Sequence, residues 1–144
     1  MILYLDASAL VKRYIKEKES ERVNAWIDAA EMVVTGLITR VEVAAAIARA
    51  GRMKLILPEE AFAALRQFRS EWESFHRLPI TENTVMRGDI LAYEENLRGY
   101  DAMHLACALI WQETVSLPVI MASFDVQLIE AARNVKMDFL PRDE

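Results

Sequence analysis

The chain has 144 residues, the size of one ordinary domain, and folding would bury about 70% of its unfolded surface. Its composition is 53% hydrophobic and 27% charged, and it has no run of about 18 apolar residues, so a membrane-spanning protein is excluded. The formal net charge of −5 argues against broad electrostatic attachment to nucleic acid, so any phosphate group must be held by local cations or by metal.

The beginning of the chain and its cysteine content bear on compartment. The opening MILYLDAS has no basic leader, and Asp6 interrupts its short apolar stretch, so we interpret it as a first strand and not a signal peptide. Cys107 is the only cysteine, which excludes an intramolecular disulfide and a multi-cysteine metal site. We therefore expect a cytoplasmic protein with one domain over residues 1–144.

Short apolar runs alternate with longer helical segments, which predicts an α/β domain around a mainly parallel sheet. The expected strands are residues 2–5, 32–36, 76–80, 118–123 and 137–140. The expected helices are residues 9–15, 20–30, 40–50, 58–75, 83–97, 101–114 and 125–134.

Two of these helices are separated by only a short segment. Gly51 is a suitable C-terminal stop for the third helix, and Pro58 suits the first turn of the fourth. Because only MKLIL joins them, we expect a helical hairpin outside the sheet. The fourth helix carries an apolar stripe at helical spacing, interpreted as core or as a groove for a partner helix, at Phe62, Leu65, Phe68, Trp72 and Phe75.

Four acidic residues stand where a strand has just ended or a helix begins. Asp6 follows the first strand, Glu42 lies in the first turn of the third helix, Asp101 opens an apolar helix, and Asp125 follows the fourth strand. In an open parallel sheet these positions share one edge, where such folds bind ligands. Converging carboxylates repel each other unless a cation lies among them, and an oxygen-only set suits Mg²⁺ or Mn²⁺.

Helix capping is the alternative explanation for the same acids. Asp6 and Asp125 could each be an ordinary N-cap. Thr39 to Glu42 fits the S/T-x-x-E capping box, which by itself would explain Glu42. Asp101 is harder to explain in this way, because its helix is apolar nearly all round and an unpaired buried charge is costly.

Two other reactive side chains lie on the same apolar helix. His104 is one turn beyond Asp101, where a general base could be imagined, but we interpret it as a hydrogen-bonded packing residue. Cys107 is interpreted as a small core residue.

Four segments in order resemble the PIN-domain ribonucleases, most closely the VapC toxins of toxin–antitoxin pairs. They are LDASALVKRY, ITRVEVAAAIAR, LRGYDAMHLACAL and SFDVQLIEAAR, and they cover residues 2 to about 139. The resemblance implies an α/β/α sandwich with an acidic pocket of Asp6, Glu42, Asp101 and Asp125, supported by the hydroxyls of Ser8 and Ser123. It also implies RNA cleavage with one or two Mg²⁺ or Mn²⁺ ions, a homodimer, and a cognate VapB-like antitoxin. Family members often have Gly after the last helix, where this chain has Asn134 and Val135; Asn tolerates the left-handed turn.

Four cationic residues near the expected site in sequence are candidates for phosphate contacts: Lys12, Arg13, Arg40 and Arg98. Three other functions are alternatives to this interpretation. A haloacid-dehalogenase-like phosphatase would place an acid where Ser8 stands, and a receiver-type signalling domain would want a second acid beside Asp6. A PIN fold that only binds RNA, or that acts in RNA maturation, is left open by the sequence.

Overall fold

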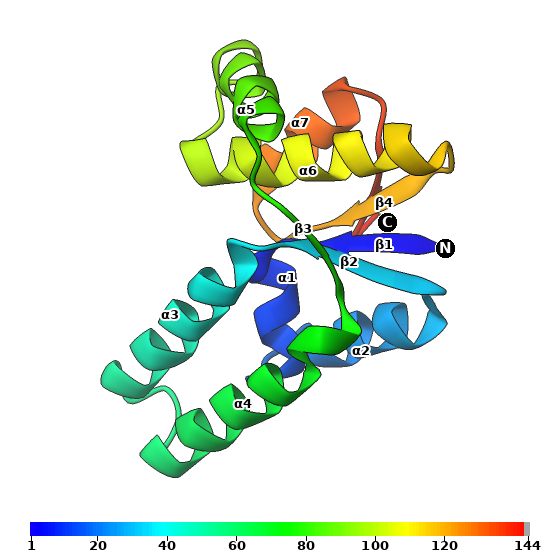
Figure 1. Ribbon diagram of the computed structural model, residues 1–144. Helices are drawn as coiled ribbons and strands as arrows, with labels where there is room; N and C mark the ends of the chain where they lie inside the picture. Colours follow the sequence, from blue (N-terminus) through cyan, green and yellow to red (C-terminus); the bar gives the residue numbers. More distant parts are fainter. Residues whose placement is uncertain (143–144) are drawn as a thin grey trace.

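Five short strands form one all-parallel sheet in the computed structural model, which describes residues 1–142 (Figure 1). The expected domain of residues 1–144 therefore ends two residues outside this part. In the order β3-β2-β1-β4-β5 the strands are His76–Leu78, Met32–Gly36, Ile2–Leu5, Val119–Ala122 and Asp138–Leu140. The predicted third strand is too long at its end, because Pro79 has no N–H group to donate to a neighbouring strand.

Seven α-helices connect these strands within residues 1–142. They are α1 Ala7–Leu10, α2 Ser20–Ala29, α3 Thr39–Arg52, α4 Pro58–Glu71, α5 Glu82–Glu94, α6 Gly99–Val115 and α7 Val126–Asn134. Short 3-10 turns at Val11–Arg13 and Trp72–Ser74 extend α1 and α4.

The α3 helix passes through Gly51, so the predicted stop is misplaced. The chain reverses at Lys54, whose φ of 56° is left-handed. Gly51 is helical and faces α4, where an added Cβ would lie 3.5 Å from the Cβ of Ala61. Figure 1 shows α3 and α4 as the predicted hairpin on one side of the molecule.

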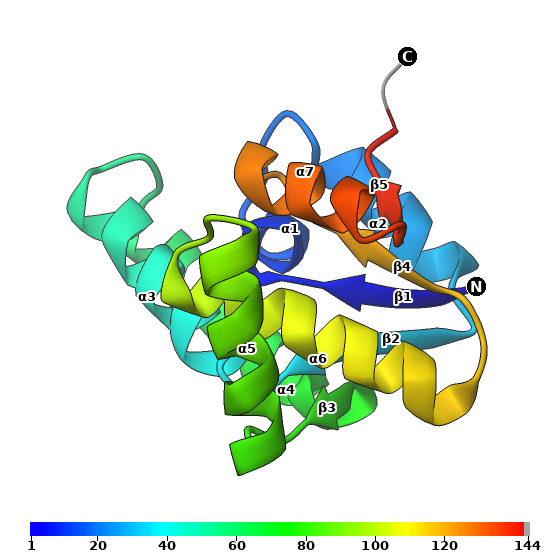
Figure 2. The same cartoon turned by 90° about the horizontal axis from the view of Figure 1, so that it is seen from above.

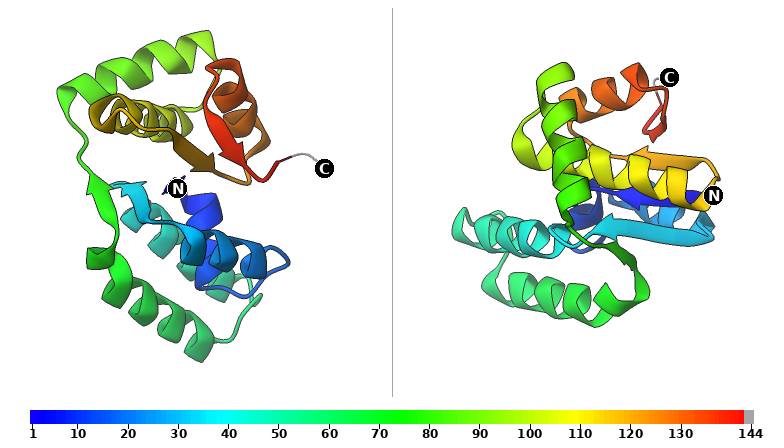
Figure 3. Two further views of the ribbon diagram at one scale, coloured as in Figure 1. Left: turned by 90° about the vertical axis from the view of Figure 1, so that its right-hand side faces the viewer. Right: turned by 45° about the horizontal axis from the view of Figure 1, so that its top comes forward.

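Side-chain alternation along the strands creates two cores, one on each face of the sheet. Tyr4 and Met121 belong to the core beneath α5, α6 and α7, whereas Leu3 and Leu5 belong to the core beneath α1 to α4. Figures 2 and 3 show how these helices are arranged around the sheet. The predicted sandwich is confirmed. The apolar stripe of α4 is mostly core, with Phe68 buried, but Phe62 is 64% exposed.

Strand order determines where a site can form. The chain moves from β1 outward through β2 to β3, and then crosses to β4 on the other side of β1. The direction of winding therefore reverses between β1 and β4, and beyond the carboxyl ends of these strands lies the crevice where open α/β sheets bind ligands. None of the helices in residues 1–142 has the length and apolar character needed to cross a membrane.

Candidate active site

Asp6 lies at the carboxyl end of the central strand β1 and is almost completely buried, with 3% of its surface exposed. Its Oδ1 accepts hydrogen bonds from the Ser8 hydroxyl at 2.7 Å and from the Ala9 N–H at 3.0 Å. Its Oδ2 accepts from the Ser123 hydroxyl at 2.6 Å. Asp6 is thus the N-cap of α1, as the capping alternative proposed, but it also joins β1 to the end of β4.

The residues after β4 extend the same network. The Ser123 hydroxyl accepts from the Asp125 N–H at 3.0 Å, and the Ser8 hydroxyl accepts from the Phe124 N–H at 2.9 Å. Asp125 is the N-cap of α7, where its Oδ1 accepts from the Leu128 N–H at 3.0 Å. Ser8 and Ser123 therefore fix the turn that carries Asp125, which is a supporting function of the kind expected for both hydroxyls.

Asp101 is the third residue of α6, not its first, because the helix begins at Gly99 after Arg98. It is 5% exposed and makes no N-cap hydrogen bond. Its Oδ2 accepts from Arg98 Nε at 3.3 Å, while another nitrogen of the same guanidinium donates to Asp125 Oδ2 at 2.9 Å. A single cationic group therefore spans two of the predicted site carboxylates.

Glu42 does not complete a capping box. Thr39 lies inside α3, and its hydroxyl accepts from Thr35 at 2.7 Å, so it does not cap the helix. The Glu42 carboxylate instead accepts from His104 Nε2 at 2.6 Å, a contact that joins α3 to α6. Glu42 therefore contacts a residue of another helix and does not form the predicted capping box.

The electrostatics of the site reflect burial and crowding of like charges. Burial raises the pKa of Asp6, opposed by the positive charge of His104 and by hydrogen bonds from both serines and Ala9. Burial and the nearby charges of Asp125 and Asp6 raise the pKa of Asp101, whereas Arg98 lowers it. The charges of Asp125 and Asp6 therefore oppose ionisation of Asp101, and a nearby cation favours it.

The donor chemistry suits a hard divalent cation, because the available side-chain ligands are carboxylate oxygens. The carboxylates are not gathered into a ready-made cage: over residues 1–142, no three His, Cys, Asp or Glu side chains are grouped closely enough to hold a metal ion. Arg98 supplies positive charge to two of them. A metal ion that used both Asp101 and Asp125 would have to displace this guanidinium.

The other three candidate cations lie further from the carboxylates. Lys12 pairs with Glu17 at 2.7 Å and lies over the Phe124 ring, next to the turn that carries Asp125. Arg13 forms a two-pronged ion pair with Glu71 of α4. Arg40 lies over the ring of Trp72. Arg98 contacts the site carboxylates directly; Arg13 is engaged in an ion pair elsewhere in the fold.

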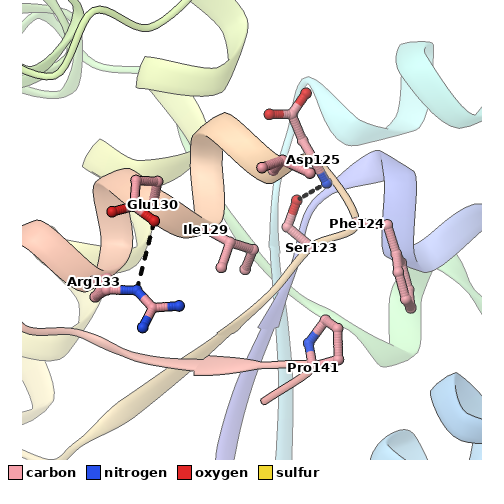
Figure 4. Close-up of a pocket in the computed structure, with 8 residues that line it drawn as sticks. Ser123, Phe124, Asp125, Ile129, Glu130, Arg133 and Pro141 are labelled. Carbon is pink, nitrogen blue, oxygen red and sulfur yellow. Dashed lines mark hydrogen bonds and ion pairs between the residues drawn. The ribbon is translucent and has the colours of Figure 1, made fainter. Parts of the chain in front are cut away.

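A hollow of about 330 Å³ begins at Asp125 and continues along α7 (Figure 4). Its lining combines the apolar side chains of Ile129 and Pro141 with the charged pair Glu130 and Arg133. Asp125 is the only proposed site carboxylate in this lining, and its carboxylate points away from Ile129 and Pro141 in Figure 4.

The structure confirms His104 as a buried, hydrogen-bonded residue, but the sequence did not identify Tyr4 and Glu42 as its partners. His104 is 1% exposed, and its Nδ1 lies 2.7 Å from the hydroxyl of the fully buried Tyr4. The only signal in the sequence was a histidine on an otherwise apolar helix, one turn after an acid.

Comparison with known proteins identifies related sequences. The family model of the PIN domain matches residues 3–134. Ribonuclease VapC45 of Mycobacterium tuberculosis is 32% identical over 108 residues, which are 75% of this chain and 75% of that protein.

Solved structures share the fold. FitAcB from Neisseria gonorrhoeae has a TM-score of 0.67 at 20% identity, over 96% of each chain. A toxin–antitoxin complex from Klebsiella pneumoniae has a TM-score of 0.56 at 20% identity, over 83% of this chain and 84% of the other.

Proposed function

We propose that this chain, which belongs to the PIN-domain family, is a VapC-type endoribonuclease that depends on Mg²⁺ or Mn²⁺. The observation that carries the proposal is that Asp101 is buried within reach of the charges of Asp125 and Asp6, which come from two other parts of the fold where the sheet reverses its winding. Two of these acids do cap helices, but Asp101 does not, and its charge is buried beside like charges.

In the proposed mechanism Asp6, Asp101 and Asp125 would hold one or two divalent cations, and Glu42 would bind such a cation directly or through water. Such a cation lowers the pKa of a bound water and stabilises negative charge on the attacked phosphate. Ser8 and Ser123 keep the Asp6 carboxylate in one orientation through their hydrogen bonds.

Arg98 has two successive roles in this proposal. It neutralises Asp101 and Asp125 in the metal-free protein, and once displaced it is available for a phosphate of the substrate. Lys12 lies beside the same turn and could be recruited by a neighbouring phosphate.

We further propose that the physiological role is that of a toxin, held inactive by a VapB-like antitoxin, and that the chain forms a homodimer. The relative in Mycobacterium tuberculosis is a VapC ribonuclease, and one protein with this fold was solved as a toxin–antitoxin complex. Light scattering should give twice the 16.5 kDa chain mass, and a single 16.5 kDa species at micromolar concentration would contradict the dimer.

The test of activity is RNA cleavage by the purified protein with Mg²⁺ or Mn²⁺, followed by chelation with EDTA. We expect cleavage that stops on chelation and is absent from Asp6→Asn, because Asn preserves a helix cap but removes the charge. Cleavage that persists after thorough chelation, or full activity in Asp6→Asn, would contradict the proposal. Growth arrest on expression of the wild type, but not of Asp6→Asn, tests the toxin role separately.

A further inference from the structure

We propose that His104 is a positioning residue that holds the Glu42 carboxylate for the metal site, and that Tyr4 fixes the His104 ring. Two short hydrogen bonds carry this inference. His104 Nε2 lies 2.6 Å from Glu42 Oε1, and His104 Nδ1 lies 2.7 Å from the Tyr4 hydroxyl. The three side chains come from β1, α3 and α6, so the chain of contacts crosses elements that are far apart in sequence.

The chemistry of the partners fixes the direction of the bond to Glu42. An ionised carboxylate can only accept, so Nε2 carries the proton and donates to Glu42. Nδ1 accepts from the Tyr4 hydroxyl when the ring is neutral and donates to the Tyr4 oxygen when the ring is positively charged. Each ring nitrogen has a defined partner, and the imidazole is held at both ends.

Burial makes this arrangement rigid. Tyr4 is fully buried, His104 is 1% exposed, and the Glu42 side chain is 23% exposed. The three hydrogen-bonded groups therefore extend from the core to a partly exposed carboxylate. The fold also leaves space for the Tyr4 hydroxyl, because a Cβ added at Gly36 would approach it to 3.0 Å. Packing alone would not require two polar groups here, since a leucine and a phenylalanine could fill similar space.

The connection with the proposed metal site is local. The His104 ring contacts Glu42 directly, and the charges of Asp6 and Asp101 also act on it. By engaging Oε1, His104 leaves Oε2 of Glu42 available to a cation or to its bound water. The inference rests on the proposed function insofar as it assigns Glu42 to that metal site.

The experiment measures Mn²⁺ affinity by calorimetry, which needs no RNA. The variants are Glu42→Gln, His104→Leu and His104→Gln, with Tyr4→Phe to remove a single hydroxyl. Loss of a hydrogen-bonding partner behind a metal ligand typically weakens metal binding about 10- to 100-fold, and we expect His104→Leu to lie in this range. His104→Gln keeps an N–H donor and should recover part of the affinity, and Tyr4→Phe should lie between His104→Leu and the wild type.

The double variant Glu42→Gln with His104→Leu separates positioning from structural damage. If His104 acts through Glu42, the double variant should bind Mn²⁺ no more weakly than Glu42→Gln alone. Additive losses would show that His104 matters only for packing. Leu105→Ala is the matched control, because it removes a fully buried side chain from the same helix and should lower stability without changing Mn²⁺ affinity.

The outcomes also distinguish this inference from the proposed function. Wild-type affinity retained in His104→Leu would overturn the inference alone. Failure of the wild type to bind Mn²⁺ would overturn the metal site, and the inference with it. Coupled Mn²⁺ affinities in a protein that cleaves no RNA would leave the inference standing and refute the ribonuclease.

Discussion

Replacing Ser123 with alanine tests whether the hydroxyls behind the site hold a buried charge. The Ser123 hydroxyl donates to Asp6 Oδ2 at 2.6 Å and accepts from the Asp125 N–H at 3.0 Å, and the side chain is fully buried. A hydrogen bond to a charged group contributes about 1.5–3 kcal/mol, and a partly buried N–H without an acceptor costs up to about 1 kcal/mol more. We therefore expect Ser123→Ala to lower the free energy of unfolding by about 2–4 kcal/mol at pH 7 in EDTA.

The pH dependence of this loss has a definite sign. Burial holds the pKa of Asp6 above its ordinary value of 3.8, and removing the Ser123 hydrogen bond would raise it further. A raised folded-state pKa means that stability is lost as the pH rises through that pKa. The deficit of Ser123→Ala should thus be smallest below about pH 3, where Asp6 is mostly protonated in both the folded and the unfolded state, and should grow as the pH rises.

Urea denaturation of both proteins over a pH series measures the difference. Ser20→Ala is the matched control, since Ser20 is also buried but its hydroxyl donates to a neutral backbone oxygen, that of Ile15. Its loss should not follow the titration of Asp6. A deficit for Ser123→Ala that is below about 0.5 kcal/mol, or that is the same at all pH values, would refute the reasoning.

Three further predictions concern other charges. Asp101→Asn should melt no lower than the wild type in EDTA, but should lose most of the stabilisation by added metal. At a metal concentration of 100 times Kd this stabilisation is about 2.7 kcal/mol. An unchanged metal response in thermal melts would contradict the prediction. Arg98→Ala should bind Mn²⁺ more tightly in calorimetry, because a competing cation is removed, and should raise KM for RNA; weaker Mn²⁺ binding would count against displacement. The hydrogen bond from Arg13 lowers the pKa of Glu71, so Glu71→Gln should be less stable than the wild type at pH 7. This difference should vanish as the pH falls through the lowered pKa, and urea denaturation at pH 7 and below that pKa measures it.

The sequence predicts which elements carry the candidate site residues better than it predicts the contacts between their side chains. Asp6 and Asp125 could be placed because each follows a short apolar strand, and parallel strands end at one edge of the sheet. Both residues cap helices and also contact other side chains, since one carboxylate can accept from a backbone N–H with one oxygen and from a neighbouring side chain with the other. The two explanations that the sequence set against each other are therefore compatible.

Long-range contacts account for what could not be predicted. Glu42 and His104 are 62 residues apart, and their helices α3 and α6 cover opposite faces of the sheet, so only the tertiary fold brings the two side chains together. The apparent capping box fails because the Thr39 hydroxyl is committed to Thr35 at the end of β2. Arg98 could be suspected from its place beside Asp101, but its bridge to Asp125 requires the turn after β4 to be in position.

The central claim is that carboxylates at the end of β1 and β4 hold a divalent cation against the cleaved phosphate. The most direct measurement is cleavage of RNA that carries sulfur in place of one nonbridging oxygen at the mapped cleavage site, with each diastereomer in Mg²⁺ and in Mn²⁺. Sulfur is a poor ligand for Mg²⁺ and a better one for softer metals. We predict that one diastereomer is cleaved slowly in Mg²⁺ and that Mn²⁺ restores its cleavage relative to unmodified RNA. Equal slowing of both diastereomers in both metals would contradict contact between the cation and the phosphate.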